Sequence, residues 1–170
     1  RRSRGELTTR WLSESTGWDQ LLAGIDPADY GGFNLVVGDL RNGFWAWIGN
    51  RDPERPHDEH PSLLRHRRLT PGLYGLSNAA LDTPWPKTLR LKQALQTALT
   101  DVGEAQHPLV EALADGTTLA STDLPVTGVP SEVERALSSP FVDMADRGYG
   151  TRSSLLVDVS RSDQGWHADL

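Results

Sequence analysis

The chain of 170 residues contains no cysteine. This absence excludes disulfide bonds, cysteine-ligated zinc, iron–sulfur clusters and a thiol nucleophile among these residues. No stretch reaches the roughly 18 consecutive apolar residues that a membrane-spanning helix needs. Lysine is also scarce, with only Lys87 and Lys92, so arginine supplies most of the positive charge.

The remaining composition is that of a globular chain, with 37% hydrophobic and 24% charged residues. The length suits one domain, and the net charge of −6 argues against general affinity for nucleic acid. The basic residues 1–4 are not followed by the apolar segment of a secretion signal. We therefore expect a cytoplasmic protein that has no membrane span and does not bind nucleic acid. Its oligomeric state stays open.

Hydrophobic periodicity predicts helices and strands in turn. The expected helices cover residues 6–25 in two pieces, 86–102, 108–114 and a segment beginning at a capping-box pair, Ser131 and Glu134. The expected strands cover residues 33–39, 44–48, 63–69, 72–78 and 152–159. This order favours an α+β fold over a doubly wound α/β fold.

The best local signal is Asn42-Gly43 between two apolar runs, which predicts a β-hairpin. In the second run Trp45 and Trp47 alternate with apolar residues of the opposite face, so we expect this strand to be covered on both sides.

A polar, proline-broken segment, residues 50–61, is expected to be an exposed insertion. It contains His57, Asp58, Glu59 and His60, which are ligand-type residues. No predicted helix holds the histidines on one face, so we predict a solvated loop and no metal site.

The run from Arg65 to Arg68 has two interpretations. It could contact phosphate, or it could be a charged edge strand that discourages pairing with other chains. In a strand, alternation would send Arg65 and Arg67 to one face and His66 and Arg68 to the other.

Two polar residues are candidates for a site. Asn78 follows a predicted strand, where its amide could stabilise an oxyanion, although an Asn there also commonly begins a turn. Arg152 could bind a carboxylate, a phosphate or an oxyanion, or instead tie down backbone carbonyls.

Several of these segments together resemble the NRDE family, also called the transport and Golgi organization 2 family. Weak markers are residues 2–5 and Asn34. The specific markers are Gly75-Leu76-Ser77-Asn78, Leu81-Asp82-Thr83-Pro84-Trp85-Pro86-Lys87, Thr127-Gly128-Val129-Pro130, residues 132–142 and Tyr149-Gly150-Thr151-Arg152-Ser153-Ser154.

The resemblance implies an N-terminal-nucleophile (Ntn) hydrolase-like αββα sandwich, with two antiparallel sheets between helix layers. Residues 1–170 match the C-terminal two-thirds of one such domain, so we expect the N-terminal strands to be lacking. In related Ntn amidases an N-terminal cysteine attacks an amide, while a later Asn and an Arg support the reaction. Asn78 and Arg152 match those supporting positions.

The resemblance leaves three functions open. The first is binding or trafficking of a small apolar anionic ligand of the haem or acyl-CoA and lipid type. Such a ligand would lie near Trp45, Trp47, Tyr74 and Trp85, with Arg152 or neighbouring arginines meeting its charge. The second is an Ntn-type amidohydrolase, whose cysteine nucleophile is absent here, so this chain alone should not catalyse. The third is a structural piece without a site. We expect no cofactor. None of the five histidines lies in a motif that matches the family, so the sequence identifies no ligand for haem iron.

Overall fold

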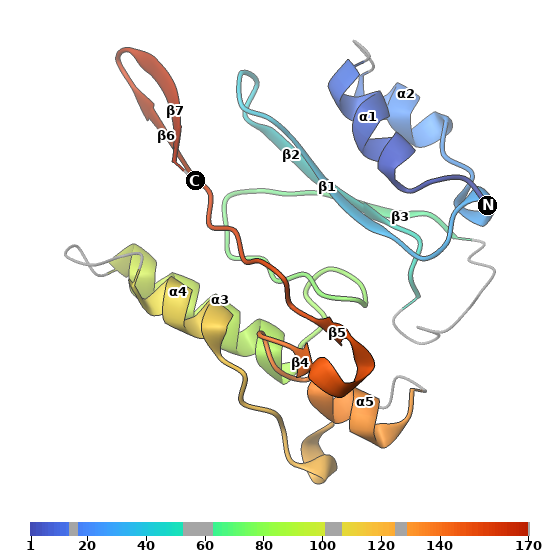
Figure 1. Ribbon diagram of the computed structural model, residues 1–170. Helices are drawn as coiled ribbons and strands as arrows, with labels where there is room; N and C mark the ends of the chain where they lie inside the picture. The colour runs from blue at the N-terminus through green and yellow to red at the C-terminus, as the bar shows by residue number, and fades with distance from the viewer. Residues whose placement is uncertain (14–16, 53–62, 101–106, 125–128, 170) are drawn as a thin grey trace. The chain divides into compact units, whose positions relative to one another are not determined.

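The computed structural model describes residues 1–13, 17–52, 63–100, 107–124 and 129–169 (Figure 1). The chain forms two compact units, Arg1–Thr88 and Leu89–Leu170, which are treated separately below. The expectation of a single domain stays a prediction.

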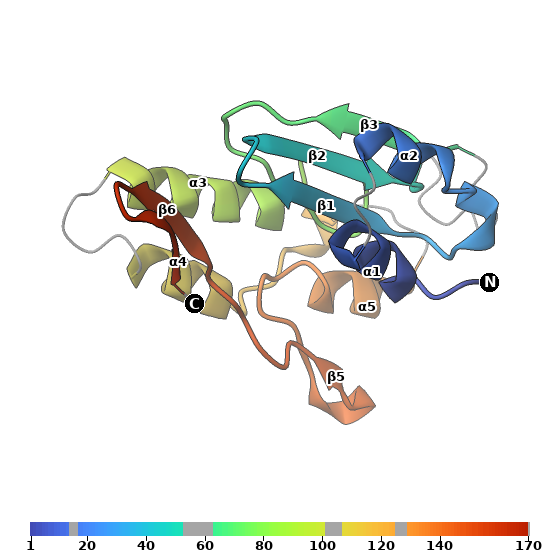
Figure 2. The same cartoon turned by 90° about the horizontal axis from the view of Figure 1, so that it is seen from above.

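The first unit contains a three-stranded antiparallel sheet in the order β1-β2-β3 (Figure 2). The strands are β1 Asn34–Asp39, β2 Phe44–Gly49 and β3 Arg65–Arg68. Val37 lies opposite Ala46 in the register, and Ile48 lies opposite His66. Three of the five predicted strands are thereby confirmed.

The predicted hairpin joins β1 to β2 through residues 40–43. Gly43 has a φ of +60°, a conformation that glycine adopts without a Cβ clash. The Asp39 carboxylate accepts hydrogen bonds from Arg41 N at 2.9 Å, Asn42 N at 3.3 Å and Asn42 Nδ2 at 2.5 Å. The loop is thus a four-residue connection closed by Asp39, rather than a two-residue Asn-Gly turn.

Two helices, α1 Gly5–Ser13 and α2 Trp18–Ala23, cover one face of the sheet (Figure 1). A short 3-10 turn, η1 Pro27–Asp29, follows where proline ends the helical pattern. The core between helices and sheet is built from apolar side chains of both layers: Leu7, Leu21, Ile25, Tyr30, Phe33, Val37, Ala46 and Ile48.

The opposite face of the sheet carries the two tryptophans of β2. Trp45 lies over Gly38, and Trp47 lies over Gly49, since an added Cβ at either glycine would fall within 2.7 Å of the indole. Trp47 is only 5% exposed, whereas Trp45 is 42% exposed and Val36 is 43% exposed. The strand was expected to be covered on both faces. On this face, Trp47 is buried as expected, whereas Trp45 is partly exposed.

Residues 72–78, predicted to be a strand, form none. The backbone closes a loop instead, because Asp82 N donates to Gly75 O at 2.8 Å and Gly75 N donates to Asp82 Oδ1 at 2.9 Å. Asp82 has a φ of +60°, in the left-handed region. These bonds occupy the backbone N–H and carbonyl groups of Gly75, which in a strand would pair with a neighbouring strand. Residues 75–82 are called the clasped loop below.

The predicted exposed insertion is wrong at its first residue. Asn50 is 2% exposed, and its Oδ1 accepts a hydrogen bond from Phe33 N at 2.7 Å. Its Nδ2 donates to Pro27 O at 3.2 Å and Gly31 O at 3.4 Å. Asn50 therefore ties η1 to the sheet. Residues 53–62, which include His57 and His60, lie outside the described residues.

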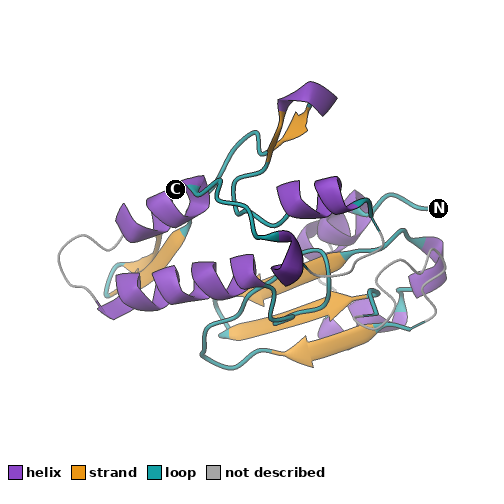
Figure 3. Cartoon of the chain, turned by 90° about the horizontal axis from the view of Figure 1, so that it is seen from below, coloured by secondary structure: helices purple, strands orange, loops and turns teal. Residues whose placement is uncertain are grey.

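The second unit combines helices with short antiparallel ladders (Figure 3). Its helices are α3 Pro86–Thr100, which begins at the end of the first unit, α4 His107–Ala114 and α5 Ser131–Ala136, with short 3-10 turns η2 Ser121–Asp123 and η3 Ala145–Arg147. All three predicted helices are confirmed, and Pro86 occupies a first turn as expected. Val102, which the pattern placed in the first of them, lies outside the described residues.

Two sequence expectations for this unit are wrong. Pro130, not Ser131, is the N-cap of α5, so the predicted capping box does not form at that position. Residues 152–157 are not a strand: β6 Asp158–Ser162 begins later and pairs with β7 Gly165–Asp169. Leu155 is 70% exposed, so the apolar run is not the buried strand its composition indicated. A shorter ladder joins β4 Asp143–Met144 to β5 Tyr149–Gly150.

The fold is therefore mixed α+β with small antiparallel sheets, as the element order predicted. Among the described helices, none has the length and apolar character required to cross a bilayer.

We predict that Asp39 stabilises the first unit only while its carboxylate is ionised. The Asn42 side chain, and then the backbone N–H groups of Asn42 and Arg41, lower the pKa of Asp39. A carboxylate with a lowered pKa stabilises the fold above its unfolded pKa and loses this contribution as pH falls. Asp39→Ala should therefore lower the melting temperature at pH 7, and its deficit relative to wild type should shrink below about pH 4.

The matched control is Asp163→Ala in the turn between β6 and β7, which should change the melting temperature little at either pH. Thermal unfolding followed by circular dichroism measures both variants. A deficit for Asp39→Ala that is equally large at pH 7 and pH 2.5 (about one unit below the ordinary carboxylate pKa) would contradict the prediction.

Candidate functional site

The side-chain amide of Asn34 joins the sheet to the clasped loop. Its Nδ2 donates to Ala79 O at 2.7 Å and to Ser77 O at 3.2 Å. Its Oδ1 accepts a hydrogen bond from Trp47 Nε1 at 3.0 Å. An Asn side chain has two N–H donors and one carbonyl, so every polar group of Asn34 is engaged. These four residues are called the Asn34 latch.

The latch leaves Asn78 at the surface of the loop. Asn78 stands between the two residues whose carbonyls Asn34 binds, and it is exposed. Its backbone is therefore fixed on both sides, while its side chain is accessible. A fixed backbone with an accessible amide is the arrangement that a ligand-contacting Asn requires, since loops carry function when a rigid scaffold positions them.

A pocket of about 560 Å³ lies next to the latch, between β3 and the clasped loop. We call it the Trp47 pocket. It is lined by Trp47, Leu64, Arg65, His66, Arg67, Ala80 and Leu81. The volume is in the range of small-molecule sites, and the lining combines apolar side chains with arginines.

Both arginines on this side of β3 face carboxylates. Arg65 Nη2 lies 3.3 Å from Asp52 Oδ1, and Arg67 Nη1 lies 3.9 Å from Asp82 Oδ2. The guanidinium of Arg67 also lies over the ring of Tyr74, at 5.2 Å from its centroid. The alternation predicted for residues 65–68 thus places Arg65 and Arg67 beside Trp47.

Tyr74 is held close to Arg67 by its own hydroxyl, which donates to Thr70 O at 2.8 Å. Hydrogen bonding with the Thr70 side chain lowers the pKa of Tyr74, and the positive charge of Arg67 lowers it further. Of the four aromatic residues expected near a ligand, Trp47 lines the pocket and Tyr74 borders it through Arg67.

The other two are placed differently. Trp45 lies on the same face of β2 as Trp47 but does not line this pocket. The ring of Trp85 is contacted by Lys87 Nζ, 5.7 Å from its centroid. Arg152 belongs to the second unit and is exposed.

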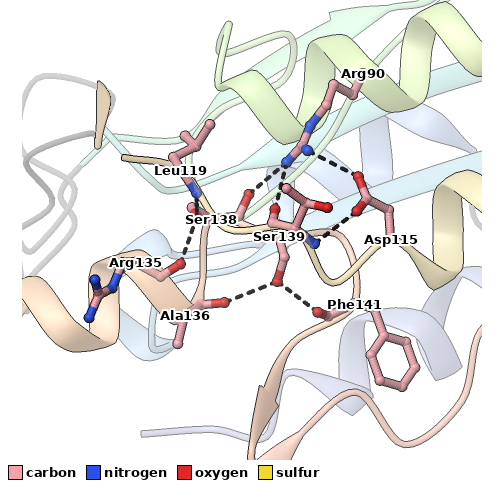
Figure 4. A network of polar contacts seen from close by, with 9 residues as sticks. Arg90, Asp115, Leu119, Arg135, Ala136, Ser138, Ser139 and Phe141 are labelled. Carbon is pink, nitrogen blue, oxygen red and sulfur yellow. Dashed lines mark hydrogen bonds and ion pairs between the residues drawn. The ribbon is translucent and has the colours of Figure 1, made fainter. Parts of the chain in front are cut away.

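The second unit contains a polar network at the family marker Ser138-Ser139 (Figure 4). Arg90 Nη1 donates to Asp115 Oδ2 at 3.0 Å, and its Nη2 donates to Ser138 O at 3.4 Å. The buried Ser139 hydroxyl donates to Phe141 O at 2.7 Å. Hydrogen bonds from Thr117, and then the charge of Arg90, lower the pKa of Asp115.

This network satisfies backbone carbonyls where α5 ends, because the Ser138 and Ser139 hydroxyls also donate to Arg135 O and Ala136 O. Thr127 and Gly128, from the neighbouring marker, lie outside the described residues. Within the described ranges, no three residues of the types His, Cys, Asp and Glu gather closely enough to hold a metal ion.

A second pocket, of about 710 Å³, was missed by the sequence analysis. It lies at the hairpin loop and is lined by Trp11, Gly17, Trp18, Gly38, Asp39, Leu40, Arg41, Asn42, Phe44 and Arg68. We call it the aromatic pocket. The sequence did carry one signal for this pocket. The alternation predicted for residues 65–68 placed Arg68 on the face of the strand opposite to that of Arg67.

Residues 1–168 match the family model "Transport and Golgi organisation 2". The "Transport and Golgi organization protein 2 homolog" of Homo sapiens is 30% identical over 169 residues, which cover 93% of this chain and 58% of that protein. The homologues of Mus musculus and Bos taurus are 29% and 30% identical, with the same coverage.

The fold and the latched loop define a mixed α+β protein with small antiparallel sheets and a fixed Asn-bearing loop. By its match over residues 1–168, the chain belongs to the Transport and Golgi organisation 2 family. The predicted family is thus confirmed. The chain spans less than two thirds of the length of the curated relatives it matches, which agrees in part with the expected match to two-thirds of a family member.

We predict that Asn34→Ala lowers the free energy of unfolding by about 1–3 kcal/mol, because it leaves the Trp47 indole and two loop carbonyls without their partner. Asn78→Ala is the matched control, since it removes an exposed amide from the same loop and should change stability by less than about 0.5 kcal/mol. Urea unfolding curves measure both. Equal stability of the two variants would show that the latch does not hold the loop.

Proposed function

We propose that the chain binds a small apolar anionic ligand, of the haem or acyl-CoA and lipid type, at the Trp47 pocket, and that the parent protein uses this binding to carry the ligand. The observation that carries the proposal is the position of Arg65 and Arg67 on the same face of the sheet as Trp47. Side chains two residues apart on a strand point to one face, roughly 7 Å from each other. Two guanidinium groups at that spacing suit a carboxylate or phosphate.

The apolar wall suits the rest of such a ligand. Trp47, Leu64 and Leu81 offer a surface on which a hydrocarbon chain or ring loses its contact with water. The carboxylates of Asp52 and Asp82 now face the two guanidinium groups, so an incoming anion would compete with them. The Arg67–Asp82 contact is the weaker of the two, at 3.9 Å.

Other predicted residues enter the proposal around this pocket. Asn78 would reach the ligand from the clasped loop, and Tyr74 would keep Arg67 oriented. Trp45, Trp85 and Arg152 stay proposed as further ligand contacts. We also propose the αββα sandwich of Ntn hydrolases as the fold of the complete protein. The half-exposed face at Trp45 and Val36 supports this, since a second sheet would cover it.

A second function is favoured by the accessible Asn78 on its fixed backbone. If the parent protein begins with the family's N-terminal cysteine, Asn78 would donate a hydrogen bond to the oxyanion formed when that cysteine attacks an amide. Arg152 would support the reaction at the last Arg position of the family pattern. The chain would then be the supporting part of an Ntn-type amidohydrolase.

We predict that Arg67→Gln weakens binding of palmitoyl-CoA or haemin by about ten- to a hundredfold, the worth of one charge-assisted hydrogen bond. Asp82→Asn should strengthen binding several-fold, because it removes the competing charge while Asn still tolerates a positive φ. Arg68→Gln, one residue further along β3 but on the other face, is the matched control for palmitoyl-CoA, which is not a planar aromatic carboxylate. Isothermal titration calorimetry measures all three.

Two results would count against the carrier function. One is the absence of binding of both ligands at micromolar concentrations. The other is an Arg67→Gln variant that binds them as tightly as the wild type. The amidohydrolase is tested separately in the parent reading frame, with an acyl probe that traps an N-terminal cysteine. An Asn78→Ala variant acylated at the parental rate would remove Asn78 from the reaction.

A further inference from the structure

The aromatic pocket lies on the helix-covered side of the sheet, beside the hairpin loop. Its aromatic walls come from three elements: Trp11 from α1, Trp18 from α2 and Phe44 from β2. The ring centroids of Trp18 and Phe44 are 5.4 Å apart, and those of Trp11 and Phe44 are 6.2 Å apart. Phe44 is therefore the central ring of the pocket, and the indoles of Trp11 and Trp18 each contact it.

The position of these walls is fixed by polar contacts. Trp11 Nε1 donates to Gly38 O at 3.2 Å, which attaches α1 to the end of β1. Trp18 also contacts the ring of His66 edge-on, at 5.9 Å. The hairpin loop that closes the pocket is held by the three hydrogen bonds to Asp39.

The charged lining differs from that of the Trp47 pocket. Arg68 stacks its guanidinium over Phe44, at 5.1 Å from the ring centroid. Among the described residues, no ion pair like those of Arg65 and Arg67 is formed by Arg68 or Arg41, although the charge of Arg41 acts on the Asp39 carboxylate of the same lining. The lining thus contains two guanidinium groups and one carboxylate, that of Asp39, which already accepts hydrogen bonds from the hairpin loop. The net charge of the lining is positive.

Such a lining selects a particular kind of ligand. Aromatic walls favour a flat ring, which stacks on indole and phenyl faces at little entropic cost. A guanidinium over the ring of Phe44 can offer its N–H groups to a carboxylate, which a guanidinium binds in a bidentate manner. The volume of about 710 Å³ accommodates a ligand of two or more fused rings.

We infer that the aromatic pocket is a second binding site, for a planar aromatic carboxylate whose ring stacks against Trp18 and Phe44 and whose charge pairs with Arg68. This site goes beyond the proposed function, because it lies on the opposite face of the sheet and uses none of the residues that line the Trp47 pocket. The two sites are neighbours at β3, where Arg67 and Arg68 are consecutive and where His66, which lines the Trp47 pocket, contacts Trp18.

The test uses 2-naphthoate as the probe and the full 170-residue chain. Indole N–H signals in two-dimensional NMR, assigned by Trp→Phe variants, report the site of binding. We expect 2-naphthoate to shift the signals of Trp11 and Trp18 and to leave that of Trp47 in place. Arg68→Gln should weaken binding by about ten- to a hundredfold. Arg67→Gln, the matched control on the other face, should change it by less than twofold.

A second comparison tests the ring specificity without changing the protein. Decahydronaphthalene-2-carboxylate has the same charge and a similar size but no aromatic face, so it should bind at least fivefold more weakly. The inference is overturned if 2-naphthoate shifts no indole signal, if Arg68→Gln binds it as well as wild type, or if the saturated acid binds equally well. None of these outcomes changes the result of the Arg67→Gln titration with palmitoyl-CoA. The two proposed sites are therefore tested independently of each other.

Discussion

The amide of Asn34 is the contact on which the described site depends. One side chain holds two carbonyls of the clasped loop and the indole of Trp47, and so fixes a loop that has no strand partner of its own. Removing water from such an amide costs free energy unless every donor and acceptor is satisfied, and here all are. The wall of the Trp47 pocket and the position of Asn78 both follow from this one arrangement.

Strand β3 then distributes the positive charge. Its alternation sends Arg65 and Arg67 to the face of the latch and Arg68 to the face covered by helices. The first two meet carboxylates of the chain, while Arg68 meets an aromatic ring. A strand of four residues therefore gives the two pockets different electrostatic character.

The sequence predicted the elements whose signals are local. The hairpin at Asn42-Gly43, the helix beginning at Pro86 and the alternation within residues 65–68 each follow from neighbouring residues. The predictions that were wrong concern segments whose structure depends on contacts with residues far away in the sequence. Residues 72–78 have the composition of a strand, yet Asp82 and Asn34 take up their backbone groups. Asn50 seemed part of a polar insertion, yet it is buried because Phe33, Pro27 and Gly31 supply its hydrogen-bond partners. No local pattern encodes such long-range pairs.

The clasped loop also has a consequence for its length. Its base is closed by paired bonds between Gly75 and Asp82, and its middle is held at Ser77 and Ala79 by a single amide. An inserted or deleted residue would move one of these points away from its partner by about 3 Å, the rise of one extended residue. The chain should therefore tolerate insertions and deletions poorly within residues 75–82.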